Sequence, residues 1–258
     1  NLDQGDSLKT YIKTDLNSDN NLTPENDTDP SKPQIFKVKI NSLIPKLNDE
    51  NFYALKVITV DGIGDENNIH NEIFYGMKMF IENIQHVMKQ YYVFFNEEKQ
   101  RIYILNEFYS GGDLVSKVEQ EVNQEVEQEV EQDSGKYSLE SKLKHIIQVT
   151  DGLSSMHNMN PPIFHLDLKL ANVMLDSKDD AFIIDFGFTD KLQFNKKTPY
   201  GVLGVGTQAN SFGVGSPDYS QPFSQQPLEK DLWAYIIFIC YLFFPMTVYE
   251  INLAKKMP

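Results

Sequence analysis

The sequence contains very little cysteine and arginine. Among its 258 residues there is one cysteine, Cys240, which excludes an intrachain disulfide framework and is typical of a reducing compartment. The one arginine, Arg101, excludes a site that needs several guanidinium groups. The first residues also lack the basic and apolar regions of a secretory signal, so we expect a cytoplasmic protein.

Positive charge is scarce as well. The chain has 23 basic and 37 acidic residues, which gives a formal net charge of −14 and a pI near 4.7. An acidic surface of this size repels phosphate backbones and anionic lipid, and the sequence has no local basic patch to reverse the repulsion. We therefore expect neither nucleic acid nor a membrane as a partner. Hydrophobic residues make up 41% of the chain, which is enough for a folded core.

A single apolar run is long enough to cross a membrane. Residues 232–249 are eighteen positions without a charge, the length at which a transmembrane helix becomes a candidate. Pro245 interrupts the run, and its flanks carry no strong basic bias. A helix that is apolar on every side is either a membrane span or the centre of a large soluble core, and the run alone favours neither.

The chain divides into segments of different character. Residues 1–34 are rich in Asn, Asp, Thr and Pro without a sustained hydrophobic period, which predicts a loop-like or disordered extension. After them, apolar residues at helical spacing predict a helix at 71–88 between two pairs of strands. The predicted strands are 35–40, 52–60, 91–95 and 101–108. The first half of the chain is therefore expected to run strand, strand, helix, strand, strand.

An internal repeat, EQEV-NQEV-EQEV, lies within residues 117–136. The segment between Lys117 and Lys136 carries seven acidic residues, which is half of the net charge. Valine recurs at every fourth residue from Val118 to Val130, a spacing that predicts a charged helix with a thin apolar stripe. We interpret the segment as a solvated acidic insert; the alternative is a docking surface for a basic partner.

Residues suited to chemistry follow a further predicted helix at 139–157 and a Pro-Pro pair. The first pattern is His165-x-Asp167-x-Lys169-x-x-Asn172, and Asp185-Phe186-Gly187 begins eighteen residues after Asp167. Phosphoryl transfer from a nucleotide needs positioning and charge neutralisation more than covalent help. Asp167 can hold the attacking hydroxyl, and Lys169 can offset negative charge on the transferred group. Asn172 and Asp185 offer oxygen ligands to Mg²⁺, which completes its shell with phosphate and water.

In order and spacing, these two segments resemble the catalytic loop and the DFG segment of eukaryotic protein kinases. The resemblance implies an α+β, protein-kinase-like two-lobed fold. Its β-rich small lobe and hinge would occupy 35–109, and its mainly helical large lobe 110–258. ATP and Mg²⁺ are the implied cofactors. Lys169 follows the pattern of serine/threonine kinases, which implies a protein substrate with a Ser or Thr hydroxyl.

The resemblance extends upstream of the catalytic loop. In ALKV, Lys56 stands where the family presents the lysine that grips the α- and β-phosphates, and Glu72 matches the helix glutamate that pairs with it. The segment ILNEFYSGGDL resembles the hinge, where the backbone of Glu107 and Tyr109 would meet the adenine. Asp113 matches an acidic residue near the ribose, and a helix N-cap is an equal alternative.

Downstream, residues 215–223 resemble the end of the activation segment, and residues 231–244 resemble helix αF of the large lobe. Other helices surround αF in this family, so the resemblance favours a core helix over a membrane span. We expect Asp231 to cap this helix and to hold the backbone of the catalytic loop. His165 is expected to be structural rather than catalytic.

The sequence departs from the family's pattern at several positions. No glycine occurs between residues 30 and 55, where the family's glycine-rich loop would cover the phosphates, so we expect weaker ATP binding. Leu166 replaces the arginine that would pair with an activation-loop phosphate, and Phe223 replaces a glutamate. The large lobe is expected to be truncated after αF, which would expose an apolar patch and favour aggregation or a partner.

Two functional hypotheses follow from these observations. The first is an active ATP-dependent serine/threonine protein kinase. The second is a pseudokinase or scaffold that binds nucleotide or partners with little turnover. The first assigns catalysis to Asp167, Lys169 and Asn172, nucleotide binding to Lys56, Glu72, Glu107, Tyr109, Asp113 and Asp185, and Mg²⁺ binding to Asn172 and Asp185.

Overall fold

The computed structural model describes residues 33–39, 52–59, 66–98, 100–127, 137–191, 219 and 226–244. Most of the predicted extension at 1–34, most of the segment 215–223 and the end of the acidic repeat lie outside the described residues. The chain forms two compact units. Of the described residues, the first unit includes those up to 66 together with 77–81 and 88–108. The second begins at 109 and also includes 67–76 and 82–87.

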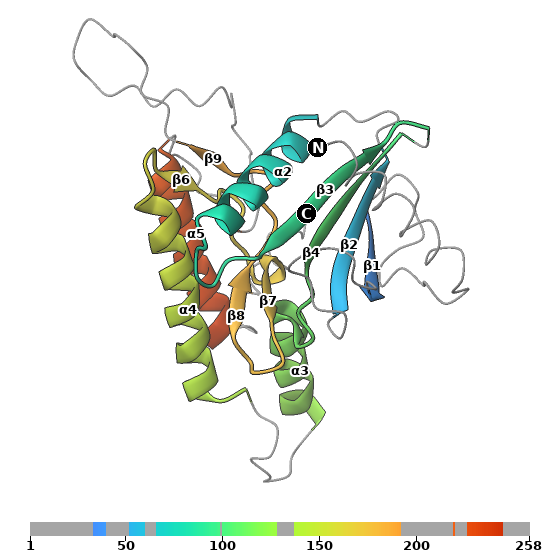
Figure 1. Cartoon of the computed structure of the whole chain (residues 1–258). Coiled ribbons are helices and arrows are strands. Elements are labelled where there is room, and N and C mark those ends of the chain that lie inside the picture. The colour runs from blue at the N-terminus through green and yellow to red at the C-terminus, as the bar shows by residue number, and fades with distance from the viewer. Residues whose placement is uncertain are drawn as a thin grey trace, which may run out of the picture. The chain divides into compact units, whose positions relative to one another are not determined.

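The first unit is built on an antiparallel sheet of four strands, in the order β1-β2-β4-β3 (Figure 1). The strands are β1 (Gln34–Lys39), β2 (Phe52–Thr59), β3 (Gln90–Asn96) and β4 (Arg101–Glu107). All four predicted strands are therefore confirmed. The central pair is β2 and β4, in a register that places Lys56 opposite Ile104.

One face of this sheet forms the core of the first unit. Alternate residues of β2, namely Tyr53, Leu55 and Val57, are buried against Tyr103 and Leu105 of β4. Successive side chains of a strand point to opposite faces, so Lys56 projects from the other face of β2. The apolar alternation of the sequence thus determines which face carries the lysine.

The helix between the two strand pairs, α2, spans Glu66–Ile81, whereas the apolar spacing predicted 71–88. The predicted end is wrong because the backbone leaves the helical region soon after Ile81. Asn83 and His86 have φ of 50° and 55°, which is left-handed conformation that a right-handed helix cannot contain. Beyond this turn, Val87 forms an isolated bridge with Ile183.

The second unit combines helices with short strands, so the fold is α+β. Its helices are α3 (Leu114–Glu127), α4 (Leu139–His157) and α5 (Pro227–Phe243), with a 3-10 turn, η1, at Leu170–Asn172. Its strands are β5 (Gly112–Asp113), β6 (Ile163–Phe164), β7 (Val173–Leu175), β8 (Ala181–Ile183) and β9 (Asp190–Lys191). They pair as β5-β7-β8 and β6-β9. The predicted helix at 139–157 is confirmed at both ends, and the Ser138 side chain caps it by accepting from the Ser141 N–H at 3.1 Å.

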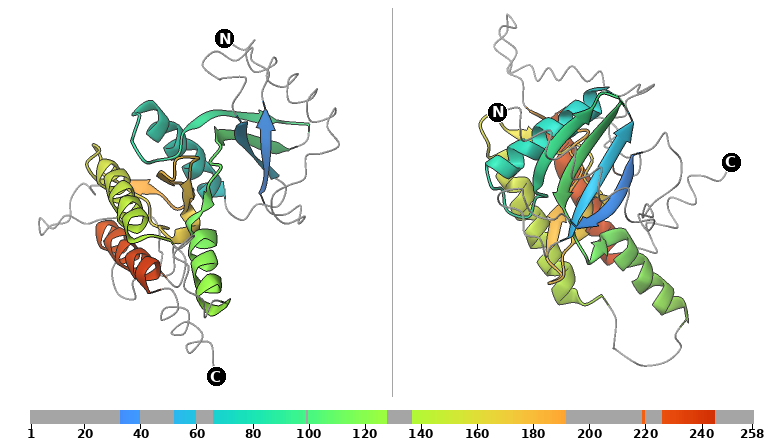
Figure 2. Two further views of the ribbon diagram at one scale, coloured as in Figure 1. Left: turned by 90° about the horizontal axis from the view of Figure 1, so that it is seen from below. Right: turned by 45° about the vertical axis from the view of Figure 1, so that its right-hand side comes forward.

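Helices α4 and α5 pack side by side and antiparallel (Figure 2). His157, at the end of α4, contacts Asp231 near the start of α5 at 2.8 Å. At the opposite ends, Lys142 Nζ lies 6.0 Å from the Phe243 ring. Over the residues that the structure describes, no helix combines the length and apolar character needed to span a membrane.

Helix α5 buries one face and exposes another. Ala234, Phe238 and Leu242 are buried, whereas Leu232 and Ile236 are 49% and 54% exposed. One face of α5 thus packs in the core, as expected of αF, and the other face exposes apolar side chains. The expectation that Asp231 caps α5 is wrong, because the helix begins at Pro227, whose fixed φ suits a first helical turn.

The acidic repeat is helical as far as Glu127, which confirms a helix in the part of the repeat that the structure describes. Val118 is buried, as the predicted apolar stripe requires. Glu121 is buried too, and its carboxylate pairs with the buried Lys142 of α4 at 2.8 Å. A fully solvated acidic insert is therefore the wrong description at Glu121. The basic partner remains a prediction.

Candidate active site

The second unit gathers the predicted catalytic residues on the loop between β6 and β7. Asp167 and Asn172 are buried, and the side chain of Lys169 is partly exposed. Lys169 Nζ lies 2.8 Å from Asp167 Oδ2. Asn172 Nδ2 donates to the same oxygen at 3.0 Å and to the Asp167 carbonyl at 2.8 Å. A carboxylate, an ammonium and a carboxamide thus meet at one point.

A second buried carboxylate, Asp231 of α5, holds the backbone of this loop. Asp231 Oδ2 accepts the N–H of His165 at 2.9 Å, and Oδ1 accepts the N–H of Leu166 at 2.7 Å. Leu166 has φ of 65°, a left-handed conformation that is costly for a residue with a β-carbon. Two charge-assisted hydrogen bonds on adjacent N–H groups stabilise this conformation. The expected contact between Asp231 and the loop backbone is therefore confirmed.

One contact of Asp231 could not be predicted from the sequence. His157 Nε2 lies 2.8 Å from Asp231 Oδ2, although the apolar spacing marks His157 only as the last residue of a helix. The contact depends on the antiparallel packing of α4 and α5. Asp231 therefore connects the end of one helix, the start of another and the catalytic-loop backbone.

The fully buried His165 uses both ring nitrogens in backbone contacts. Nε2 lies 3.0 Å from the carbonyl oxygen of Ile184, and Nδ1 accepts the N–H of Asp167 at 3.3 Å. This pattern corresponds to a neutral imidazole with its proton on Nε2. The ring joins the catalytic loop to the segment that carries Asp185.

Asp185 lies on a segment that is bonded directly to Asn172. The neighbouring Ile184 N–H donates to the Asn172 carbonyl at 2.9 Å. Asp185 has φ of 67°, and its Oδ1 accepts the N–H of Gly187 at 3.2 Å. A β-carbon on Gly187 would lie 3.3 Å from Asp185 Oδ1, a tight contact that would require the Asp185 side chain to shift slightly.

Two residues on these adjoining segments carry oxygen atoms of the kind that suits a magnesium ion. Asn172 directs both hydrogens of its amide nitrogen to Asp167, which leaves its carbonyl oxygen as the atom that could meet a cation. Asp185 supplies a carboxylate on the adjoining segment. Mg²⁺ prefers oxygen ligands of this kind, with one or two carboxylates and the rest of its shell from phosphate and water.

The predicted phosphate lysine and its glutamate occupy different units. Lys56 is half-buried on β2 of the first unit, and Glu72 is buried on the part of α2 that belongs to the second. Their ion pair remains a prediction. In the second unit, Asn71, beside Glu72, donates from Nδ2 to the Gly187 carbonyl at 3.4 Å, so α2 contacts the segment that follows Asp185. The apolar spacing that predicted a helix at Glu72 did not indicate the contact between Asn71 and Gly187.

The hinge candidates lie on either side of the boundary between the units. Glu107 ends β4, and its N–H donates to the Lys89 carbonyl at 2.9 Å. Tyr109 is buried, and its ring stacks on Phe182 with the centroids 4.7 Å apart. Asp113 precedes α3 and accepts the N–H and the hydroxyl of Ser116 at 2.8 and 3.2 Å, which is the geometry of a helix N-cap. The nucleotide roles of these three residues remain predictions.

The sequence profile described as "Protein kinase domain" matches residues 42–256 of this chain. The match covers far more than half of the chain, so the chain belongs to the protein kinase domain family and has its α+β, two-lobed fold.

Serine/threonine kinases are among the relatives of the chain. The probable serine/threonine-protein kinase samkA of Dictyostelium discoideum is 26% identical over 146 residues, which are 57% of this chain and 20% of the relative. CBL-interacting serine/threonine-protein kinase 17 of Arabidopsis thaliana is 33% identical over 48% of this chain and 23% of the relative. Calcium/calmodulin-dependent protein kinase type 1 of Caenorhabditis briggsae is 27% identical over 70% of this chain and 44% of the relative. The chain thus spans less than half of the length of each.

Proposed function

We propose that this chain is a serine/threonine protein kinase that transfers the γ-phosphate of ATP to protein hydroxyl groups. The observation that carries the proposal is the convergence of Lys169 and Asn172 on the carboxylate of Asp167, within a loop anchored by Asp231. Family membership and the serine/threonine kinases among the relatives support the same reaction class.

Asp167 would orient the substrate hydroxyl and accept its proton. The hydroxyl oxygen forms a bond to the γ-phosphorus while the bond from that phosphorus to the bridging oxygen of ADP breaks. Lys169, 2.8 Å from the same carboxylate, would stabilise negative charge on the transferred group. Asn172 and Asp185 would hold Mg²⁺, which offsets the charge of the phosphates when bound.

Five further residues would bind the nucleotide. Lys56 would contact the α- and β-phosphates and be positioned by Glu72. The backbone at Glu107 and Tyr109 would meet the adenine, and Asp113 would lie near the ribose. Asp113 can cap α3 through its contacts with Ser116 and still present a lone pair, since an ionised carboxylate accepts several hydrogen bonds.

A second candidate function, a pseudokinase with little turnover, is favoured by one specific observation. The sequence lacks glycine between residues 30 and 55, and backbone amides approach a triphosphate closely only where side chains do not intrude. A weak phosphate cradle would loosen ATP binding and leave the γ-phosphate poorly aligned with Asp167, so transfer would be slow even with the catalytic residues in place. The two functions therefore differ in their turnover.

The test is transfer of labelled γ-phosphate from Mg-ATP to a basic protein substrate, by the unaltered chain and by Asp167→Asn. We expect transfer to fall by at least about a hundredfold in the variant, since loss of a positioned general base has effects of this order. Glu119→Gln, at an exposed carboxylate on α3, is the matched control and should transfer normally. Binding of a fluorescent ATP analogue with and without Mg²⁺ is measured in parallel. Magnesium-dependent binding with equal, background-level transfer in all three proteins would replace the kinase by the pseudokinase.

A further inference from the structure

Helix α4 carries an apolar stripe on its outer face. Leu139, Leu143 and Ile147 recur at every fourth residue and are 62%, 46% and 60% exposed. This spacing places the three side chains on one side of the helix, over a length of about 12 Å. The opposite side of α4 contains Val149, Leu153 and other buried residues. The stripe is thus a second apolar face on a helix whose first face already forms core.

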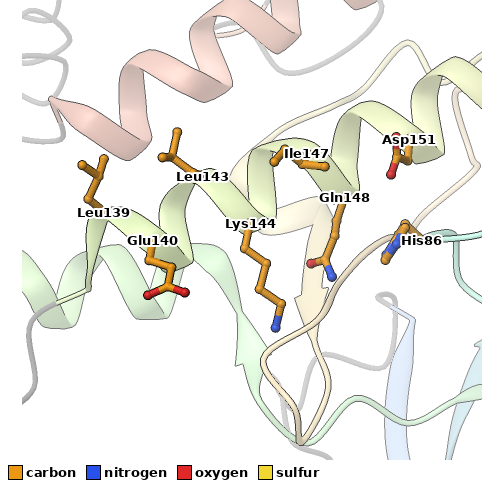
Figure 3. A pocket seen from close by; sticks show the side chains of 8 residues that line it. All are labelled: His86, Leu139, Glu140, Leu143, Lys144, Ile147, Gln148 and Asp151. Atoms are coloured by element: carbon orange, nitrogen blue, oxygen red, sulfur yellow. The ribbon is translucent and has the colours of Figure 1, made fainter.

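The stripe forms one bank of a shallow, open groove that runs along α4 (Figure 3). The other bank is polar and belongs to the next row of the same helix, with His86 at one end. Lys144 in this bank donates to the Lys178 carbonyl at 3.0 Å and lies 3.0 Å from Asp180 Oδ1. Gln148 is held between Asp180 and the Ala181 N–H, at 2.7 and 2.8 Å. These contacts hold the bank in place and neutralise its one lysine.

Each end of the groove carries an exposed carboxylate. Glu140 and Asp151 both line the groove, and they are eleven residues, or three helical turns, apart on the same side of α4. Neither has an ion-pair partner within the ranges that the structure describes. The groove therefore combines an apolar stripe with uncompensated negative charge at both ends, separated by about 16 Å along the helix.

We propose that this groove docks an amphipathic helix of a partner protein, with an apolar ridge on one side and a lysine or arginine three turns apart at its two ends. An amphipathic helix commonly binds by laying its apolar ridge into an apolar groove of its partner. A partner helix of about 12 residues matches the length of the groove, and its basic ends would pair with Glu140 and Asp151. The net charge of −14 also favours the approach of a basic segment.

A second copy of this chain fits the groove poorly. Two copies would each carry a charge of −14. If two α4 helices paired antiparallel over the whole groove, Glu140 of each copy would lie beside Asp151 of the other. Like charges placed together across an interface oppose association. The charge pattern therefore selects a basic helix over a second acidic one.

Binding can be measured by fluorescence anisotropy with three synthetic helical peptides of about 18 residues. The first has a leucine ridge at four-residue intervals and lysines three turns apart, the second replaces the lysines by glutamates, and the third scrambles the ridge. The full chain should bind the first peptide at least about tenfold more tightly than either of the others. Equal binding of the lysine and glutamate peptides would overturn the proposal.

Variants of the chain test the location of the site. Ile147→Ser should weaken binding of the lysine peptide by about tenfold, whereas Ile81→Ser, at a more exposed isoleucine of α2, should have no effect. The double variant Glu140→Lys with Asp151→Lys should reverse the preference toward the glutamate peptide. Unchanged peptide binding in Ile147→Ser would contradict the assignment of the docking site to this groove.

Sedimentation velocity without peptide tests the alternative occupant of the groove, a second copy of the chain. Self-association that Ile147→Ser abolishes, together with no peptide binding, would assign the groove to a second copy and overturn the proposal. The groove variants do not involve Asp167, so failure of phosphate transfer and failure of docking are independent results.

Discussion

Asp231 accepts the backbone N–H of Leu166 at 2.7 Å across 65 positions of sequence. The acceptor is fully buried in α5, and the donor residue has a positive φ in the catalytic loop. An unusual backbone conformation persists only where its surroundings stabilise it, and the carboxylate of Asp231 does this for the loop that presents Asp167. The geometry at Asp167 therefore depends on a helix that contains none of the proposed catalytic residues.

Replacing Asp231 by alanine should both destabilise the protein and impair its proposed activity. The variant leaves one buried and one half-buried N–H group without their charged acceptor, a loss of about 3 kcal/mol in the free energy of unfolding. Urea denaturation measures this loss, and phosphate transfer should fall in the same variant under conditions where it remains folded. Glu229→Gln, an exposed position in the same helix, should change stability by less than about 0.5 kcal/mol. Normal stability of Asp231→Ala would show that the loop does not depend on this carboxylate.

Replacing Lys169 by methionine should lower kcat by about a hundredfold with a smaller effect on ATP binding. The ammonium contacts Asp167 at 2.8 Å, so it would act where negative charge develops in the transition state. Steady-state kinetics with varied ATP separate kcat from KM. Lys178→Met, at an exposed lysine, is the control. A change confined to KM would instead place Lys169 among residues that bind nucleotide without assisting transfer.

Removing one member of the buried Glu121–Lys142 ion pair should destabilise the protein, whereas replacing both members by apolar residues should cost little stability. Glu121→Gln leaves a buried ammonium without its counter-charge, which should destabilise the protein by about 3 kcal/mol. The double variant Glu121→Leu with Lys142→Met should recover most of that loss, since apolar residues of similar size replace buried ion pairs well. Glu119→Gln, two residues earlier and exposed, should be neutral. Chemical denaturation of the four proteins checks these expectations, and a loss in the double variant as large as in the single one would contradict them.

Acid should destabilise the second unit in two steps. Burial lowers the pKa of His145 below its ordinary value of 6.5, although the Asp179 backbone and carboxylate oppose the shift. The unfolded chain therefore binds a proton at pH values where the folded His145 does not, so stability falls as pH drops below about 6.5. The second step involves Asp180, whose pKa is lowered from 3.8 mainly by hydrogen bonds from Lys144 and Gln148. Its contribution is present above about pH 4 and is lost as pH falls further.

The His145 step can be isolated by mutation. The ring lies between the Tyr137 hydroxyl at 2.5 Å and the Asp179 carbonyl at 2.9 Å, so a protonated imidazole could no longer accept from Tyr137. In His145→Gln the dependence of stability on pH should flatten between about pH 7 and pH 5. His70→Gln, at an exposed histidine, should keep the original slope. An unchanged slope in His145→Gln would remove His145 as the cause.

Local patterns in the sequence predicted most of the helices and strands and the grouping of the proposed catalytic residues. The alternation of β2 and β4 and the apolar spacing of α4 predicted those elements because each depends on residues that are close in the chain. The order of Asp167, Lys169 and Asn172 predicted their meeting because a short loop keeps them together. The end of α2 was mispredicted because apolar spacing continues past Ile81, while the left-handed backbone at Asn83 has no apolar signal.

The tertiary structure decided what distant residues do to one another. Glu121 looked like one of many solvated carboxylates, and it is buried because α3 packs where Lys142 can neutralise it. The sequence predicted the contact of Asp231 with the catalytic loop, but it wrongly predicted a helix cap and gave no indication of the contact with His157, which depends on how α4 packs on α5. The uniformly apolar run of α5 does not reveal which face is buried, because burial depends on the helix packed against it. Short-range periodicity determined the elements by itself, whereas burial, charge pairing and exposed faces required the fold.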